Sequence, residues 1–232
     1  MIQIKNNKVI KGDCLEQLDV LPKDSVDLVV TDPPYGIEYQ SKHRDDKFDV
    51  LENDDVIDTS FIPKIERNTK PNSAIYVFTR WDVYPEWLEA VKDSEFEVKN
   101  CIVWDKKRHG MGDLKESYGP QHEFIIYATK GTVELNGKRP SDIISEERLN
   151  ELDLEHPTEK PVSLIAKLIK NSSDKGDLVL DPFAGSGSTL VAAEKFGRNY
   201  IGIEIAEKFV RLARQRLKDS KSQKRITDLE NL

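Results

Sequence analysis

A short segment of this 232-residue chain, VVTDPPYG at residues 29–36, combines residue types that suit chemistry on a bound molecule. The β-branched run that leads into it predicts a strand buried on both faces. Pro33 and Pro34 remove two backbone donors and fix two φ angles, so the strand must end there. Asp32 is thereby placed at the carboxyl end of a buried strand, with Tyr35 on a stiff turn. A strand-ending turn with a capping acid would explain the same residues, and the segment alone does not decide between these interpretations.

A second segment, LVLDPFAGSGSTLVAAE at residues 178–194, reads as a strand, a glycine-containing loop and a helix. Gly185 and Gly187 allow the backbone to approach a ligand closely, and the start of the helix offers free N–H groups and the positive end of its dipole. No lysine follows Gly187, so the phosphate-binding pattern GxxxxGK[ST] is absent, and Leu190 breaks the dinucleotide pattern GxGxxG. The segment therefore predicts a nucleotide-type cofactor other than ATP or NAD.

Acidic residues end two further predicted strands. Glu204 closes the strand after the glycine loop, 17 positions beyond Gly187, and an acid at this place typically binds the ribose hydroxyls of an adenosine-containing cofactor. Asp13 ends the first apolar run of the chain in the same manner. Ligands of open α/β sheets bind at the carboxyl edge where the strand order reverses. We therefore expect Asp13, Asp32 and Glu204 to converge with the glycine loop at that edge.

The segment HPTEKP at residues 156–161 has two interpretations. Thr158 is suited to cap the following helix and Pro161 to occupy its first turn, which would be sufficient structurally. In the functional interpretation, Lys160 binds an anionic group of the cofactor. Both interpretations stay open at this point.

Short apolar β-branched runs alternate with amphipathic helical patterns along the chain. This alternation predicts a mostly parallel sheet with helices on both faces. In the polar stretch 132–155, Asn136-Gly137 is a typical hairpin turn. The seven predicted strands lie within residues 8–13, 26–32, 72–79, 96–106, 122–131, 177–183 and 199–205.

Composition and charge narrow the class of protein. With 33% charged and 38% hydrophobic residues, the chain is expected to be globular with a highly charged surface. No apolar run approaches a membrane span, and the first residues lack the apolar core of a signal peptide. The two cysteines lack the spacing of a metal site and are too few for a disulfide scaffold. We therefore expect a cytoplasmic protein that needs no metal.

A net charge of −7 does not exclude nucleic acid as a partner, because binding needs only a local positive face. Basic residues outnumber acids between residues 99 and 115, where Trp104 and His109 are interleaved with them. Lys106, Lys107 and Arg108 are the candidate contacts to DNA phosphates.

The motifs DPPY, HPTEKP, DPFAGSGST and the strand end GIE, in that chain order, resemble those of the β-class S-adenosylmethionine-dependent DNA amino-methyltransferases. The resemblance extends over nearly the whole chain. It implies one catalytic domain, residues 1–232, with a circularly permuted Rossmann-like methyltransferase fold and a mostly parallel seven-stranded sheet. Because this family places the DPPY strand beside the glycine-loop strand, residues 32–35 and 183–187 should share one cleft.

The resemblance also implies a mechanism, transfer of a methyl group to the N6 amine of an adenine flipped out of double-stranded DNA. Asp32 and the carbonyl of Pro33 would accept the two hydrogens of the amine, Pro34 would stiffen the turn, and the ring of Tyr35 would stack on the base. By the same resemblance, the residues that hold S-adenosylmethionine are Asp13, Cys14, Asp32, Thr158, Lys160, Asp181, Phe183, Ala184, Gly185, Ser186, Gly187, Glu204 and Ile205.

Several alternatives stay open. Cytosine-N4 methylation uses the same geometry, although members with that activity more often carry serine at the position of Asp32. RNA as substrate, a catalytically inert nucleic-acid-binding module and a nucleotide-dependent oxidoreductase are further readings. A homodimer through the sheet edge and a cognate restriction enzyme are both compatible with the resemblance. Target recognition is expected in the loops at residues 36–60, 106–120 and 132–155.

Overall fold

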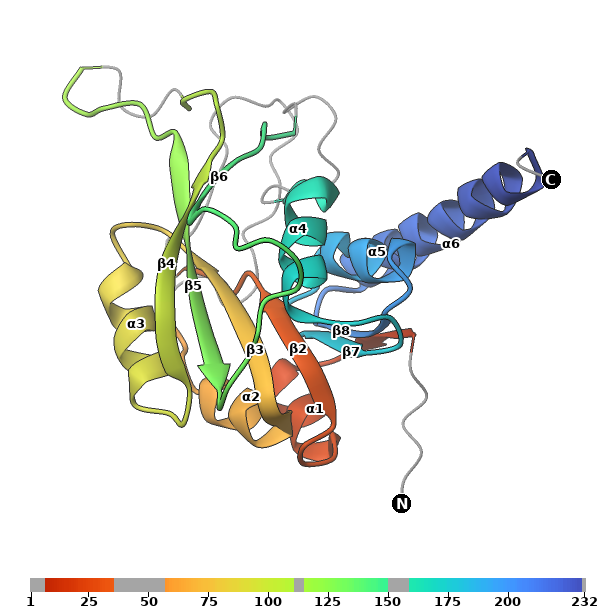
Figure 1. The fold of residues 1–232 in the computed structure, drawn as a ribbon, viewed down its shortest axis with the longest axis horizontal. Coiled ribbons are helices and arrows are strands. Elements are labelled where there is room, and N and C mark those ends of the chain that lie inside the picture. The colour runs from red at the N-terminus through yellow and green to blue at the C-terminus, as the bar shows by residue number, and fades with distance from the viewer. Residues whose placement is uncertain (1–6, 36–56, 111–114, 150–158, 231–232) are drawn as a thin grey trace.

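The computed structural model describes residues 7–35, 57–110, 115–149 and 159–230, with the side chains of α6 described as far as residue 222. These residues form an eight-stranded sheet in the order β1-β8-β7-β2-β3-β5-β4-β6 (Figure 1). The strands are β1 (Lys8–Lys11), β2 (Val26–Thr31), β3 (Thr69–Thr79), β4 (Glu97–Asp105), β5 (His122–Lys130), β6 (Ile143–Ser145), β7 (Leu178–Asp181) and β8 (Asn199–Glu204). The helices are α1 (Cys14–Val20), α2 (Ile62–Asn68), α3 (Tyr84–Lys92), α4 (Val162–Ser172), α5 (Ser188–Lys195) and α6 (Glu207–Glu230).

The predicted parallel sheet is confirmed, because five of the seven neighbouring strand pairs run parallel and only β5 runs antiparallel to its neighbours. All seven predicted strands are present. The eighth, β6, was not predicted, since it has only three residues and lies in a polar stretch. The sequence analysis also missed the seven-residue helices α1 and α2.

The hairpin predicted at Asn136-Gly137 is wrong. Gly137 does have a positive φ of 74°, as such a turn requires. No pair of strands flanks it among the described residues, however, and β6 pairs instead with β4 in parallel. The side-chain amide of Asn136 donates to the carbonyl oxygens of Lys170 at 3.2 Å and Ser173 at 2.9 Å. A local turn signal therefore serves to attach this segment to the end of α4.

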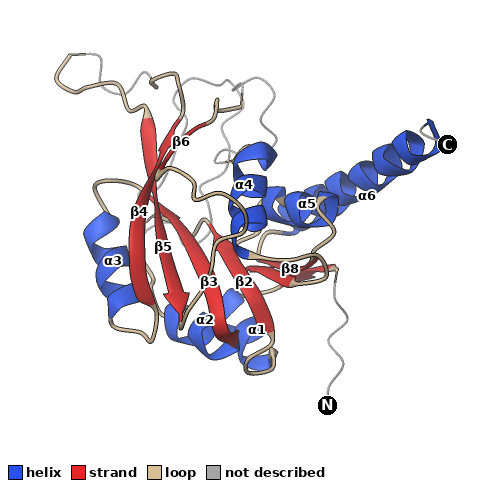
Figure 2. Ribbon diagram, in the orientation of Figure 1, coloured by secondary structure: helices blue, strands red, loops and turns tan. Residues whose placement is uncertain are grey.

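Helices lie on both faces of the sheet (Figure 2), and the buried apolar residues form two clusters. Helices α1, α2 and α3 contribute to one cluster, and α4, α5 and α6 contribute to the other. Alternate residues of β2 enter different clusters, Val29 the first and Leu28 the second, so this strand is buried on both faces as predicted. The far end of α6 extends away from the sheet (Figure 1). No helix in the described ranges is long and apolar enough to cross a membrane.

The strand order reverses between β7 and β2. From β2 the chain continues through α2 to β3 on one side, and from β7 it continues through α5 to β8 on the other. Such a reversal opens a crevice at the carboxyl ends of the two strands, which is where sheets of this type bind ligands. The segments that follow β2 and β7, residues 32–35 and 182–187, therefore lie at one edge.

Candidate active site

Four carboxylates follow four neighbouring parallel strands at this edge. Asp181 ends β7, Glu204 ends β8, Asp32 follows β2, and Asp13 follows β1 after one glycine. The backbone N–H of Gly12 donates to the carbonyl of Glu204 at 3.1 Å, so the ends of β1 and β8 are joined directly. The predicted convergence of strand-end acids is therefore present in the structure.

The glycine loop folds back onto Glu204. The backbone N–H of Gly185 donates to Oε2 of Glu204 at 2.9 Å, and that of Ala206 donates to Oε1 at 2.8 Å. Gly187 has φ 82° at the N-cap of α5, and a Cβ added there would lie 2.8 Å from the Cβ of Ala213 in α6. Glycine is therefore required at position 187 by backbone conformation and by close packing.

Phe183 and Ala184 complete the loop. The ring of Phe183 packs edge-on against Phe61, with 4.9 Å between the ring centroids. The backbone N–H of Ala184 donates to the carbonyl of Ile203 at 2.8 Å. These contacts tie the loop to the start of α2 and to β8, which fixes the path of its backbone.

Arg216 of α6 holds the loop from outside, and the sequence analysis did not identify it. One of its terminal nitrogens donates to the carbonyl oxygen of Ser186 at 2.9 Å and to its hydroxyl at 2.6 Å. The other contacts Oε1 of Glu159, at 2.6 Å, from the HPTEKP segment. The guanidinium thus links two motifs that were predicted to meet around the cofactor. The arginine lies among several basic residues of a helix, and no spacing rule distinguishes it from them.

The DPPY segment has an inward-facing acid. Pro33 and Tyr35 are buried, and Asp32 is half-buried. The hydroxyl of Tyr35 donates to Oδ1 of Asp32, and the ammonium of Lys160 donates to Oδ2. Both oxygens of the candidate catalytic carboxylate therefore have a donor in this structure.

Lys160 contacts carboxylates of the protein, and its predicted contact to the cofactor stays a prediction. Its ammonium is directed at Asp32, and it lies 3.3 Å from Oε2 of Glu123, a residue of β5. It also lies 5.4 Å from the ring centroid of Phe78 and 5.9 Å from that of Tyr35. Thr158, the other predicted residue of the motif, lies outside the described residues.

Glu123 was also missed, although it lies in a predicted strand. Its Oε1 contacts the ammonium of Lys106 at 2.5 Å, and that ammonium lies 5.2 Å from the centroid of the Trp104 ring. The side chain of Lys106 is only 17% exposed, so its charge is directed inward. Of the other predicted phosphate contacts, Lys107 and Arg108 are exposed, and Arg108 forms an ion pair with Glu147. Binding of DNA phosphates by these residues remains a prediction.

Burial dominates the electrostatics of the acids. It raises the pKa of Asp32, opposed by the charge of Lys160 and reinforced by that of Glu123. Burial likewise raises the pKa of Asp181 to about 7, opposed by a hydrogen bond from Thr189. For Lys160, burial disfavours the ammonium, but the two carboxylates outweigh it and raise its pKa.

Asp13 and Cys14 stand where an adenine ring was expected. Oδ1 of Asp13 accepts hydrogen bonds from the backbone N–H of Leu15 at 2.8 Å and of Glu16 at 3.3 Å, so it caps α1. Burial, with the charge of Asp13, raises the pKa of the Cys14 thiol to about 12, which keeps it neutral. Ile205 is 37% exposed at the same edge. Their contacts to the cofactor remain predictions.

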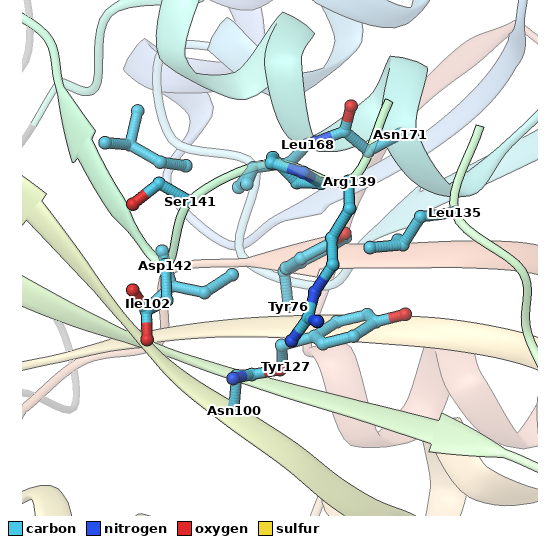
Figure 3. A pocket seen from close by; sticks show the side chains of 12 residues that line it. Tyr76, Asn100, Ile102, Tyr127, Leu135, Arg139, Ser141, Asp142, Leu168 and Asn171 are labelled. Carbon is cyan, nitrogen blue, oxygen red and sulfur yellow. The ribbon is translucent and has the colours of Figure 1, made fainter. Parts of the chain in front are cut away.

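A separate cavity of about 240 Å³ lies over the middle of β3, β4 and β5, beneath residues 135–144 and beside α4. Its floor is the stacked pair Tyr76 and Tyr127, with ring centroids 4.9 Å apart, and the side chain of Arg139 extends into it (Figure 3). This volume is below the roughly 300–1,000 Å³ typical of ligand sites. The acidic edge, and not this cavity, is the candidate active site.

The polar groups at this edge of the sheet are complementary to those of S-adenosylmethionine. The sulfonium and amino groups of that molecule are cationic, and its ribose and adenine carry hydroxyl and amine donors. The edge supplies carboxylates for both kinds of group in Asp13, Asp181 and Glu204. The backbone of Phe183–Gly187 and the start of α5 offer N–H groups to its carboxylate.

Comparison with known proteins agrees with this geometry. Residues 26–215 match the model of the N6/N4 DNA methylase family. A putative methylase of Escherichia coli K12, YubD, is 34% identical over 215 residues, which cover 91% of this chain and 90% of the relative.

Two solved structures share the fold and confirm the predicted Rossmann-like methyltransferase class. The complex of M1.HpyAVI with S-adenosylmethionine has a TM-score of 0.71 and 25% identity, covering 90% of this chain and 98% of that one. The cytosine-N4-specific PvuII DNA methyltransferase has a TM-score of 0.76 and 21% identity, covering 98% of this chain and 92% of that one. The chain therefore belongs to the N6/N4 DNA methylase family and is an S-adenosylmethionine-dependent DNA methyltransferase.

Proposed function

We propose that this enzyme methylates the N6 amine of adenine in double-stranded DNA. The observation that carries the proposal is Asp32, a carboxylate rather than a serine, at the end of β2 beside the glycine loop. The PvuII enzyme acts on cytosine N4, but at 21% identity its likeness speaks for the fold alone. Adenine N6 is the leading target, and cytosine N4 is the alternative that the test must separate from it.

The chemical difficulty is the amine itself. The lone pair of an adenine amine is delocalised into the ring, so the nitrogen is a poor nucleophile. Two acceptors directed at its two hydrogens draw it towards tetrahedral geometry and localise the lone pair. The carboxylate of Asp32 serves as one acceptor and the carbonyl of Pro33 as the other. The paired prolines hold that carbonyl in place before the base arrives, so little entropy is lost in aligning it.

Tyr35 has two roles in this proposal. Its hydroxyl donates to Asp32, which orients the carboxylate. Its ring supplies a face on which the flipped base stacks, an interaction of about 1–3 kcal/mol for an aromatic side chain. That gain offsets much of the cost of extruding the base, which is a few kcal/mol.

When bound, S-adenosylmethionine would supply the methyl group and keep the electron pair of the broken carbon–sulfur bond on its sulfur, and the methylated amine would lose a proton to water. The residues expected to hold it are those of the glycine loop, with Glu204 at the ribose and Asp13 at the adenine. Cys14 and Ile205 would lie against the adenine ring. Asp181, buried at the end of β7, would lie near the amino group.

Transfer of a radioactive methyl group to duplex DNA, followed by mass spectrometry of the digested nucleosides, tests the proposal. We expect N6-methyladenine as the product, and loss of at least 1,000-fold in rate for Asp32→Ala. The matched control is Asp19→Ala, because Asp19 is an exposed acid that pairs with Lys64 on the surface. N4-methylcytosine as the product would favour the alternative, and full activity of Asp32→Ala would refute the mechanism.

The proposal includes a cytoplasmic location. The mechanism itself needs neither a homodimer nor a cognate restriction enzyme. Light scattering of the purified protein and restriction assays on DNA that it has methylated would test those two associations separately.

A further inference from the structure

Both oxygens of the candidate catalytic carboxylate already accept a hydrogen bond in this structure. Oδ1 of Asp32 accepts from Tyr35 and Oδ2 accepts from Lys160. Each oxygen keeps a second lone pair, but the ammonium of Lys160 neutralises the carboxylate, so a target amine competes with these donors for Asp32. The arrangement therefore raises the question of which donor moves and what receives it.

Lys160 is the donor with a second acceptor close by. Oε2 of Glu123 is 3.3 Å from its ammonium, and this oxygen is buried and accepts no aligned hydrogen bond from the described residues. The described contacts of the Tyr35 hydroxyl, by contrast, involve Asp32 only. A small rotation of the lysine side chain would exchange Asp32 for Glu123 without taking the ammonium out of its pocket.

Glu123 is itself held in place. Its Oε1 pairs with Lys106 at 2.5 Å, and the side chains of Glu123 and Lys160 are 15% and 7% exposed. Among the described residues, the carboxylates of Asp32 and Glu123 and the ammonium groups of Lys106 and Lys160 thus form one cluster of alternating charge. Moving a cation between two carboxylates of one buried cluster costs little, whereas leaving it unpaired there would be strongly unfavourable.

We propose that Glu123 is a positioning residue for methyl transfer, which receives the ammonium of Lys160 when the target amine displaces it from Asp32. Lys160 neutralises Asp32 before the base enters. Glu123 then accepts the lysine, and Oδ2 of Asp32 becomes available to the amine. After transfer, the return of Lys160 to Asp32 displaces the product base. This inference rests on the proposed function, because it assigns the exchange to the same site.

Replacement of Glu123 by Gln tests the exchange. We expect kcat/KM for DNA to fall at least tenfold, because Lys160 then loses the second carboxylate that it contacts among the described residues and competes with the amine for Asp32. The Kd for S-adenosylhomocysteine, measured by calorimetry, should stay within twofold. The matched control is Glu194→Gln, since Glu194 pairs with Lys221 at 3.6 Å on the α5–α6 side. An unchanged kcat/KM, or an equal loss of cofactor affinity, would overturn the inference.

The pH profile supplies a second readout. Asp32 is faced by Lys160, Tyr35, Asp181 and Glu123. The negative charge of Glu123 raises the pKa of Asp32. Removing that charge should move the acid limb of kcat/KM to lower pH while the plateau falls. A limb that stays in place would contradict the electrostatic coupling between Glu123 and Asp32.

A double-mutant cycle with Lys160→Met tests whether Glu123 acts through the lysine. In that background, Glu123→Gln should cause no further loss of kcat/KM, because the lysine through which Glu123 acts is absent. An equal loss in both backgrounds would overturn the inference. Should Lys160→Met not fold, the variant Glu123→Asp is measured instead. Its shorter side chain keeps the carboxylate charge but holds it farther from Lys160, so its kcat/KM should lie between those of the parent and Glu123→Gln. Activity of Glu123→Asp equal to that of the parent would overturn the inference.

The proposed function and this inference fail separately. If the parent enzyme methylates no adenine in DNA, the proposed function fails whatever the variants do. If the parent does so and Glu123→Gln matches it, only the exchange is refuted.

Discussion

Substitution of Arg216 tests whether α6 orders the glycine loop that is expected to hold the cofactor. Its guanidinium contacts the carbonyl and hydroxyl of Ser186 and the carboxylate of Glu159 at the same time. Lysine keeps the charge, but its single ammonium cannot span both partners, because only the planar fork of arginine offers donors in both directions. In Arg216→Lys, we therefore expect the contact to Ser186 to be lost while that to Glu159 is kept.

The magnitude follows from these contacts. A hydrogen bond to a charged group contributes about 1.5–3 kcal/mol, so the melting temperature should fall by several degrees, at roughly 2–4 °C per kcal/mol for a chain of this size. The cofactor must then order the backbone of Ser186 on binding, at about 1–2 kcal/mol for one residue. This cost corresponds to a Kd for S-adenosylhomocysteine raised about 5–30-fold.

Titration calorimetry measures the Kd, and differential scanning calorimetry measures the melting temperature. The control is Arg211→Lys on the same helix, because Arg211 is exposed and pairs only locally with Glu207. A Kd within twofold of the parent, together with a lowered melting temperature, would show that Arg216 stabilises α6 without ordering the loop. That result would refute the prediction that Arg216 orders the glycine loop for cofactor binding.

Two further predictions concern groups at the same edge. Gly187→Ala should destabilise the protein by more than the roughly 1–2 kcal/mol of a left-handed residue, because its Cβ would meet Ala213 at 2.8 Å. Gly137→Ala, with φ 74° and no atom within 4 Å of an added Cβ, is the control that shows the backbone cost alone, and equal urea midpoints for the two variants would contradict the packing argument. The pKa of Asp181 is raised to about 7 in the folded protein. The stability contributed by its protonated form is therefore fully present below the unfolded pKa near 3.8 and is lost as the pH rises through 7. Asp181→Asn should therefore gain melting temperature relative to the parent between pH 4 and pH 7 and no more above that, and a pH-independent difference would refute the shift.

Much of the edge could be predicted because its signals are local. A β-branched run followed by an acid and two prolines specifies a strand end wherever it occurs, since the prolines stop the ladder of hydrogen bonds. The run that ends at Asp181 and continues into the glycine loop likewise specifies a strand end. Parallel strands then bring these ends together without further information.

The failures concern contacts between distant segments. Asn136-Gly137 has the chemistry of a hairpin turn, but the amide of Asn136 finds better partners at the end of α4 than a second strand would provide. A turn signal reports backbone conformation, and Gly137 has the expected φ. It does not report which segment the turn will pack against.

The same limit explains why Glu123 was not predicted as a neighbour of Asp32 and Lys160. Glu123 lies 91 positions after Asp32, in a strand that reads as ordinary, and only the antiparallel placement of β5 beside β3 brings its carboxylate to the edge. The side chains that decide how Asp32 is charged thus come from β5, from the turn after β2 and from the segment before α4, and no local pattern links these three places. Local patterns predict where the chemistry of this chain takes place, whereas the control of that chemistry depends on the assembled sheet.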